Sequence, residues 1–272
     1  MRHPLQKRLC AVPRPRTGVL LTSAAVLLSA ASLGAAAPAQ AQDKSRVTAA
    51  VLALNGTGHE PTVYGDDVHY DTASIIKVDI LATVLLQAQD AKRSLTAQER
   101  AYADPMIRHS DNTAANALWR QIGRAPGLEA ANKRLGLTAT KGGPGARWGL
   151  TRTTASDQIR LLRAVFDTGR TPKTGATALN AQSRAYVRAL MNDVADEQAW
   201  GVSAAGSPWA LKNGWLQRDT SGLWDVNSVG RIMVDGHPYL VAVLSDGNAS
   251  MSKGVSLVQR TARAAVSSAA GR

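Results

Sequence analysis

The segment Tyr70–Lys77 contains a serine and a lysine that could together perform nucleophilic chemistry. Ser74 and Lys77 lie three residues apart at the predicted start of a helix, so their side chains share one face. The helix N-terminus favours an anion on the serine oxygen, and the apolar neighbours would desolvate the lysine amine and lower its pKa. A neutral amine can accept the serine proton. Alone, however, this spacing favours a helix-capping serine followed by a surface lysine.

Two further segments contain residues suited to the same chemistry. Ser110–Asn112 precedes a predicted helix, and alone it favours a helix cap. The segment Lys212–Trp215 lies in a predicted strand, and a lysine on a strand that borders a cleft can bind a carboxylate. Gly214 beside it would let a substrate approach the backbone closely. Alone, this segment favours an exposed lysine on an edge strand.

Hydrophobic periodicity predicts the elements that must position these residues. A strand over 46–54 and a short second strand over 61–70, with a turn at residues 65–66, precede a mostly buried helix over 74–89. Further helices are predicted over 97–106, 112–122, 128–135, 154–167 and 180–194, with a glycine-rich loop over 141–150. Three strands, over 210–216, 223–234 and 239–245, and a last helix over 251–265 follow.

This order of elements predicts an α+β fold with three layers, α-β-α. An antiparallel sheet would form from both chain ends, and an all-helical subdomain would be inserted between them. The sheet part would comprise residues 42–73 and 196–272, and the helical part residues 74–195. A cleft would form where the two parts meet.

Residues 1–41 have the features of a signal peptide. They carry five basic residues and no acidic one, an apolar run over 19–33 and the small-x-small site Ala39–Ala41. The apolar run is too short to favour a membrane-spanning helix. We therefore expect cleavage after Ala41 and a secreted catalytic domain, 42–272, without a membrane span. Cleavage lowers the net charge of the 272-residue chain from +12 to +7, and no dense basic patch remains to suggest nucleic-acid binding.

The cysteine and histidine content excludes several kinds of site. Cys10, in the signal segment, is the one cysteine of the sequence, so thiol nucleophiles, disulfides and cysteine-based zinc sites are excluded from the mature chain. The five histidines have no metal-ligand spacing. His109, beside Ser110, favours a structural role over a place in the cleft. We expect no metal and no cofactor, and a monomeric protein.

The three segments, in this order and these contexts, resemble the signature of class A β-lactamases and penicillin-binding proteins: Ser-x-x-Lys, Ser-Asp-Asn and Lys-x-Gly. The stretch 108–116 resembles the Ser-Asp-Asn helix of that superfamily, and Thr153-Thr154 resembles the pair after its omega loop. Lys173-Thr174-Gly175 spells the third motif literally but lies in a loop, so Lys212-Asn213-Gly214, 102 residues after Ser110, is favoured.

The resemblance implies a role for each residue. Ser74 would attack an amide or ester carbonyl to form an acyl-enzyme, with Lys77 as its base and Ser110 as the relay to the leaving nitrogen. The substrate would be a β-lactam or a D-Ala-D-Ala-type cell-wall peptide. It would be held by Asn112, Lys212, Asn213, Gly214 and Trp215. The backbone amides of Ser74 and Trp215 would form the oxyanion hole.

One feature departs from the class A pattern. Such enzymes place a glutamate in the omega loop to activate the deacylating water, whereas no acidic residue lies between Glu129 and Asp157 here. Rapid hydrolysis of the acyl-enzyme by the class A route is therefore not expected. A slowly deacylating penicillin-binding or sensor protein and a non-catalytic cell-wall-binding module remain alternatives. Trp148 and Trp215 are equally compatible with a cleft wall and with the core.

Overall fold

The computed structural model describes residues 45–55, 60–167 and 179–271, all within the compact unit Ala41–Arg272. The predicted signal segment 1–41 and the literal motif Lys173–Gly175 lie outside the described residues.

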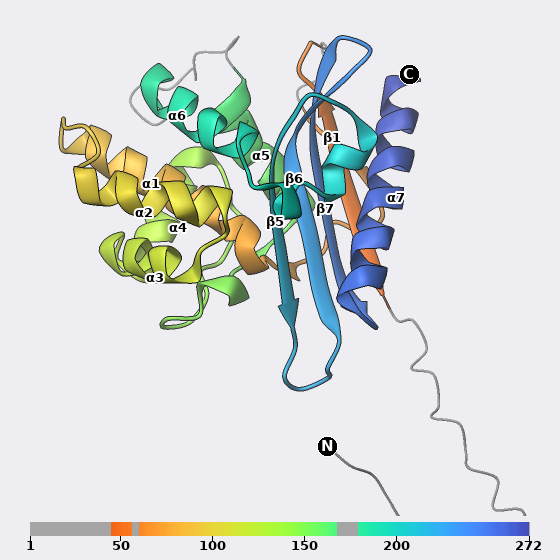
Figure 1. Cartoon of the computed structure of the whole chain (residues 1–272), viewed down its shortest axis with the longest axis horizontal. Coiled ribbons are helices and arrows are strands. Elements are labelled where there is room, and N and C mark those ends of the chain that lie inside the picture. Colours follow the sequence, from red (N-terminus) through yellow and green to blue (C-terminus); the bar gives the residue numbers. More distant parts are fainter. Residues whose placement is uncertain (1–44, 56–59, 168–178, 272) are drawn as a thin grey trace, which may run out of the picture. The chain divides into compact units, whose positions relative to one another are not determined.

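The centre of this unit is a five-stranded antiparallel sheet whose strands come from both ends of the chain (Figure 1). The spatial order is β2-β1-β7-β6-β5, with bounds Thr62–Tyr64, Arg46–Ala53, His237–Asn248, Trp224–Val234 and Trp209–Gln217. The first strand therefore pairs with the last one, and β5 forms one edge. The predicted sheet architecture is confirmed.

The predicted second strand over 61–70 differs from the observed structure. Only β2 joins the main sheet, whereas β3 (Tyr70–Asp71) pairs with β4 (Arg152–Thr153) in a separate two-stranded ladder. Gly65 between them has a φ of 87°, which turns the chain away from the sheet. An ion pair between Asp71 and Arg152 then holds β3 against the loop that precedes α5.

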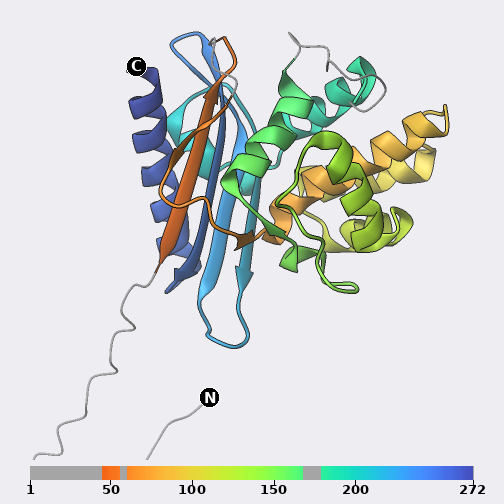
Figure 2. The same ribbon diagram turned by 180° about the vertical axis from the view of Figure 1, so that it is seen from behind.

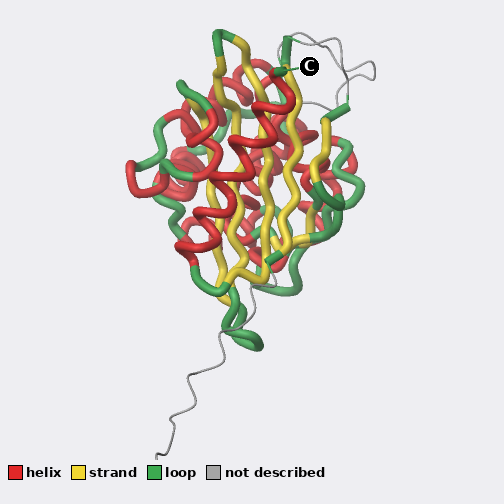
Figure 3. The backbone as a smooth tube through the Cα atoms, turned by 90° about the vertical axis from the view of Figure 1, so that its right-hand side faces the viewer, coloured by secondary structure: helices red, strands yellow, loops and turns green. Residues whose placement is uncertain are grey.

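Among the described residues, six helices lie on one side of the sheet, with α5 and α6 directly against its strands, and α7 lies on the other side, so that the fold has three layers (Figures 1 and 2). The six are α1 to α6: Ile76–Asp90, Ala97–Arg108, Asn112–Gln121, Arg124–Leu135, Ala155–Phe166 and Ala181–Asn192. Figure 3 shows α7 (Met251–Ala270) lying across the strands on the outer face. Within the ranges described, no helix is long and apolar enough to cross a membrane.

Strand β7 shows how the sequence makes two cores. Leu240, Ala242 and Leu244 are buried against the six-helix layer, whereas the alternate residues Val241 and Val243 are buried against α7. Successive side chains of a strand point to opposite faces, so a nearly continuous apolar run predicts a strand covered on both sides.

Local capping fixes where the helices that carry the candidate site begin. The Asp111 carboxylate accepts a hydrogen bond from the Ala114 amide (2.6 Å) at the start of α3, and Thr154 caps α5 through the Asp157 amide (3.2 Å). The Asp157 carboxylate itself binds Thr140 (2.8 Å) and the Ala139 amide (2.8 Å), so it anchors the preceding loop rather than the helix start.

Candidate functional site

Ser74 lies on the short 3₁₀ turn η1 (Ala73–Ile75), directly before α1. Ala73 has a φ of 46°, in the left-handed region that non-glycine residues rarely occupy. Such strain persists only where the surroundings enforce it, and it is typical of functional sites. Ser74 is half-buried and lines a cleft of about 600 Å³.

Lys77 is fully buried one helical turn beyond Ser74. Its Nζ donates to the Ser110 carbonyl (2.6 Å), to Ser110 Oγ (3.0 Å) and to Asn112 Oδ1 (2.8 Å); the Ser74 hydroxyl is not among these acceptors. Burial lowers the pKa of Lys77 to about 7, although the nearby Asp111 carboxylate opposes this shift. A large fraction of the amine is therefore neutral at pH 7 and can accept a proton.

Ser110 lies at the junction of the site. Its Oγ is 3.0 Å from Lys77 Nζ and 3.0 Å from Lys212 Nζ, so one hydroxyl connects a lysine of α1 with a lysine of β5. Ser110 has a φ of 57°, the second left-handed non-glycine residue of the site. A hydroxyl between two amines can both accept and donate a proton, which suits a relay.

Lys212 is only 1% exposed, although β5 is an edge strand. Its ammonium also donates to the Asn213 carbonyl (2.8 Å). Burial, and then the positive charge of Lys77, hold the pKa of Lys212 well below its usual range. The alternative of an exposed edge-strand lysine therefore does not hold, because η1 and the helical layer cover this edge.

Gly214 brings β5 against the nucleophile. A Cβ at this position would lie 2.6 Å from the Ser74 amide nitrogen, 2.7 Å from the Ile75 nitrogen and 2.9 Å from the Thr72 carbonyl oxygen. These atoms belong to the backbone, so only a glycine permits this approach. The sequence predicted close approach of a substrate at Gly214, whereas the neighbour that this glycine admits is the Ser74 backbone.

The Asn213 side chain points away from this approach. Its amide nitrogen donates to the carbonyls of Gln198 (2.7 Å) and Trp200 (2.9 Å), and so it anchors the segment that precedes β5. Trp215, two residues further along β5, lines the cleft, and its ring centroid lies 5.9 Å from that of Trp200. A place for Asn213 in substrate binding can then involve only its backbone.

Trp148, on the 3₁₀ turn η2 (Trp148–Leu150), forms the opposite wall of the cleft. Its indole nitrogen donates to Asn116 Oδ1 (2.8 Å), and its ring centroid lies 4.9 Å from Lys77 Nζ. Trp148 and Trp215 both line the cleft, and each also packs against the edge of a hydrophobic core, so both of the roles that the sequence left open are present. Asn116 was not predicted as a site residue, although it lies one helical turn after Asn112 and thus on the same face of α3.

A buried carboxylate below the cleft was also not predicted. Asp71, three residues before Ser74, pairs with Arg152 (3.3 Å) and with Arg218, and so joins β3, β4 and the end of β5. Burial raises the pKa of the neighbouring Asp225 to about 7, while Arg218 opposes this shift. An isolated aspartate carries no sequence signal for partners that lie about 80 and 150 residues away.

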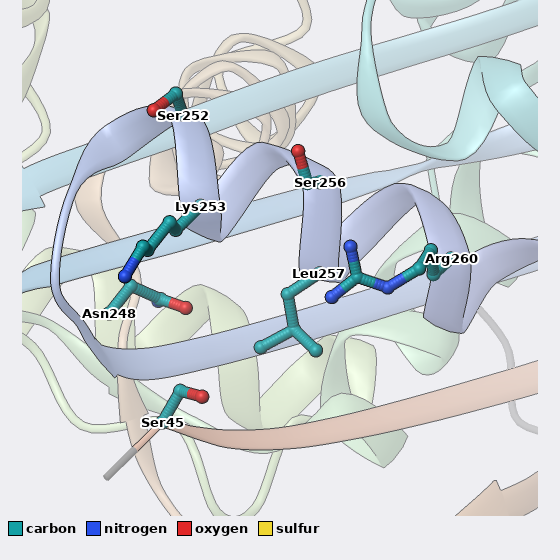
Figure 4. Close-up of a pocket in the computed structure, with 7 residues that line it drawn as sticks. All are labelled: Ser45, Asn248, Ser252, Lys253, Ser256, Leu257 and Arg260. Carbon is teal, nitrogen blue, oxygen red and sulfur yellow. The ribbon is translucent and has the colours of Figure 1, made fainter. Parts of the chain in front are cut away.

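A second hollow lies on the outer face, between α7 and the ends of β1 and β7. Figure 4 shows Lys253 reaching toward Asn248 and Arg260 lying beside Leu257. None of the residues of the three motifs lines it. Among the described residues, no group of three potential metal ligands lies together, and His109 is exposed at the end of α2.

Comparisons with known proteins establish the family and the fold. Residues 99–269, more than half of the chain, match the family described as "Beta-lactamase enzyme family". "Putative lipoprotein LppW" of Mycobacterium tuberculosis (strain H37Rv) is 28% identical over 148 residues, 53% of this chain and 46% of the relative, and the Mycobacterium bovis protein of that name matches equally. The chain thus spans about half the length of these curated relatives.

Solved structures show the same fold. The TLA-3 extended-spectrum β-lactamase superposes with a TM-score of 0.68 at 15% identity, over 83% of this chain and 94% of that chain. A β-lactamase from Chitinophaga pinensis superposes with a TM-score of 0.67 at 18% identity, over 81% of this chain and 93% of that chain.

Proposed function

Since the chain belongs to the β-lactamase enzyme family and has the fold of its serine hydrolases, we propose that it is a secreted serine hydrolase that forms an acyl-enzyme at Ser74. The observation that carries the proposal is the pair of hydrogen bonds from Lys77 and Lys212 to Ser110 Oγ, beside the cleft that Ser74 lines. Neither metal nor cofactor takes part in the proposed reaction.

In the first step, the neutral Lys77 amine removes the Ser74 proton while Ser74 Oγ attacks the substrate carbonyl. Lys77 lies one helical turn from Ser74, and burial holds its pKa at about 7, so the amine is neutral often enough to act as the base. The amides of Ser74 and Trp215 would hold the oxyanion, because β5 lies against the Ser74 amide at Gly214.

In the second half of acylation, the carbon–nitrogen bond breaks and the leaving nitrogen takes the proton of Ser110 Oγ. Lys77, now protonated, returns a proton to Ser110 through their 3.0 Å hydrogen bond. Lys212 donates a hydrogen bond to the same hydroxyl, and it would also orient the substrate carboxylate. Asn112, exposed and part of the cleft wall, would hold the substrate's amide.

The substrate would be a β-lactam or a D-Ala-D-Ala-type cell-wall peptide, bound by a monomer outside the cell. Arg147, an exposed cation among the cleft residues, favours a substrate that carries a carboxylate. The name of the mycobacterial relatives, a lipoprotein, supports a place in the cell envelope.

A second candidate is a penicillin-binding sensor that is acylated once and releases its acyl group slowly. It is favoured by the cleft lining, in which Asp219, on the exposed hairpin after β5, is the one acidic residue among those described. A non-catalytic cell-wall-binding module remains the third candidate.

Incubation of the mature protein with a fluorescent penicillin and with nitrocefin separates the three. Covalent labelling that is lost in Ser74→Ala supports the acyl-enzyme, and nitrocefin turnover distinguishes hydrolysis from a stable adduct. Equal absence of label in the wild type and in Ser74→Ala contradicts the enzyme proposal and favours the binding module.

A further inference from the structure

Two carboxamide side chains lie one above the other on the cleft face of α3. Asn112 and Asn116 are both exposed, and both line the cleft. They are four residues apart in α3, so about 6 Å separates them along the helix axis. Only Asn112 belongs to the three motifs, and the proposed reaction gives Asn116 no role.

Hydrogen bonds within the protein determine which atom of each carboxamide faces the cleft. Lys77 Nζ donates to Asn112 Oδ1 (2.8 Å), and the Trp148 indole nitrogen donates to Asn116 Oδ1 (2.8 Å). An indole N–H can only donate, so reversing the Asn116 carboxamide would lose this bond. Within the part of the chain that the structure describes, neither amide nitrogen donates to a protein acceptor. Both NH₂ groups are therefore available to a ligand.

Two hydrogen-bond donors at this spacing match an extended peptide. In an extended chain every second carbonyl points to the same side, and these carbonyls repeat at about 6.6–6.8 Å. The repeat of the two asparagines is about 6 Å, and small rotations of their side chains make up the difference. An acyl group with a single carbonyl beyond the scissile bond would engage Asn112 alone. A longer peptide would engage both asparagines.

We propose that Asn116 is a second substrate-binding residue and that the cleft prefers an extended acyl peptide to a small acyl group. Asn112 binds the first carbonyl before the scissile one, and Asn116 binds the carbonyl two residues further from the scissile bond. The preferred substrate is therefore a peptide with at least two residues before the one that is transferred to Ser74. This inference rests on the proposed acylation of Ser74.

The test uses three acyl donors of increasing length: the thioesters of N-acetyl-D-alanine, N-acetylglycyl-D-alanine and N-acetylglycylglycyl-D-alanine. Ser74 Oγ bonds to the D-alanyl carbonyl carbon, the carbon–sulfur bond breaks, and the sulfur leaves as a thiol that takes up the proton. The mature chain contains no cysteine, so the thiol can be measured with a thiol reagent. The rate constant is that of the first turnover, corrected with Ser74→Ala.

Only the longest donor has a second carbonyl in register with Asn116. In the wild type its second-order rate constant should exceed those of both shorter donors by about fivefold, the effect of one added hydrogen bond. The middle donor should react like the shortest one, because its additional carbonyl points away from α3.

Asn116→Asp provides the matched variant. It keeps an oxygen for the Trp148 indole but replaces the amide donor by a second oxygen, so the advantage of the longest donor should disappear. Arg120→Gln is the control, because it changes the net charge by the same amount on α3 but lies outside the cleft lining. It should keep the advantage. The ratio of long to short donor is compared within each protein, so a general effect of charge on Lys77 cancels.

Equal rate constants for the three donors in the wild type overturn the inference, and this comparison needs no variant. An advantage that Asn116→Asp retains in full also overturns it. If a fluorescent penicillin labels the wild type but no thioester reacts, the inference is wrong while the proposed function stands. If neither the penicillin nor any thioester reacts, the proposed function itself is contradicted.

Discussion

Replacing Gly214 by alanine tests whether the contact between β5 and Ser74 sets the geometry of the reaction. The added Cβ would lie 2.6 Å from the Ser74 nitrogen, and relief to 3.4 Å, the start of ordinary contact, requires the two backbones to separate by about 0.8 Å. A displacement of this size between nucleophile and oxyanion donors can reduce a rate about 100-fold. Overpacking should also lower the free energy of unfolding by about 1–3 kcal/mol.

The assay is the second-order rate constant of labelling by a fluorescent penicillin, measured together with the thermal midpoint. Gly254→Ala is the matched control, because its Cβ would lie 2.4 Å from Val226 Cγ2, in the core beneath α7 and outside the cleft. We expect both variants to lose stability but only Gly214→Ala to lose the labelling rate. Labelling of a folded Gly214→Ala protein at the rate of the control would refute the argument.

Three further predictions concern protons and buried polar groups. The labelling rate should rise about tenfold per pH unit up to about pH 7 and then level off, as the neutral Lys77 amine forms; a flat profile would contradict its role as the base. Asp79 is fully buried, and burial raises its pKa to about 7 although the neighbouring Asn132 side chain opposes this shift, so stability should fall as the pH rises from about 4 to 7. Asp225, whose pKa burial also raises to about 7, contributes to the same decline, so Asp79→Asn should make the decline in thermal melts smaller without removing it; an unchanged decline would contradict the contribution of Asp79. Asn213→Ala should cost about 2 kcal/mol in chemical denaturation, because it removes the donor from the buried Gln198 carbonyl and from the part-buried Trp200 carbonyl, whereas a loss below about 0.5 kcal/mol would argue against this anchoring role.

The sequence predicted the fold because its signals are local and repeat along each element. The continuous apolar run of β7, the capping of α3 by Asp111 and of α5 by Thr154, and the order of strands and helices together specify a sheet from both ends with helices inserted. The juxtaposition of Ser110 with Lys77 and Lys212 was expected only through the resemblance of three motifs, since no local signal brings them together.

What the sequence could not predict depends on contacts between distant segments. The pairing of β3 with β4 involves two residues on each side, too few for a periodic pattern. The orientation of Asn213 toward Gln198, and of Trp148 over Lys77, follows from how the loops fold back on the sheet. The burial of Lys212 has the same cause, because a side chain on the edge strand β5 becomes buried only once η1 and the helical layer lie against it.

The pairing of β1 with β7 has a consequence for how this protein folds during its synthesis. Arg46 and Asp246, partners across β1 and β7, are 200 residues apart, so the nascent β1 has no long neighbour until the residues up to β7 have been synthesised. Assembly should therefore be slow and late, and it would leave an apolar ribbon open to premature association or proteolysis. Truncation before β7 would then remove the strand that pairs with both β1 and β6, so the two ends of the sheet would no longer be joined.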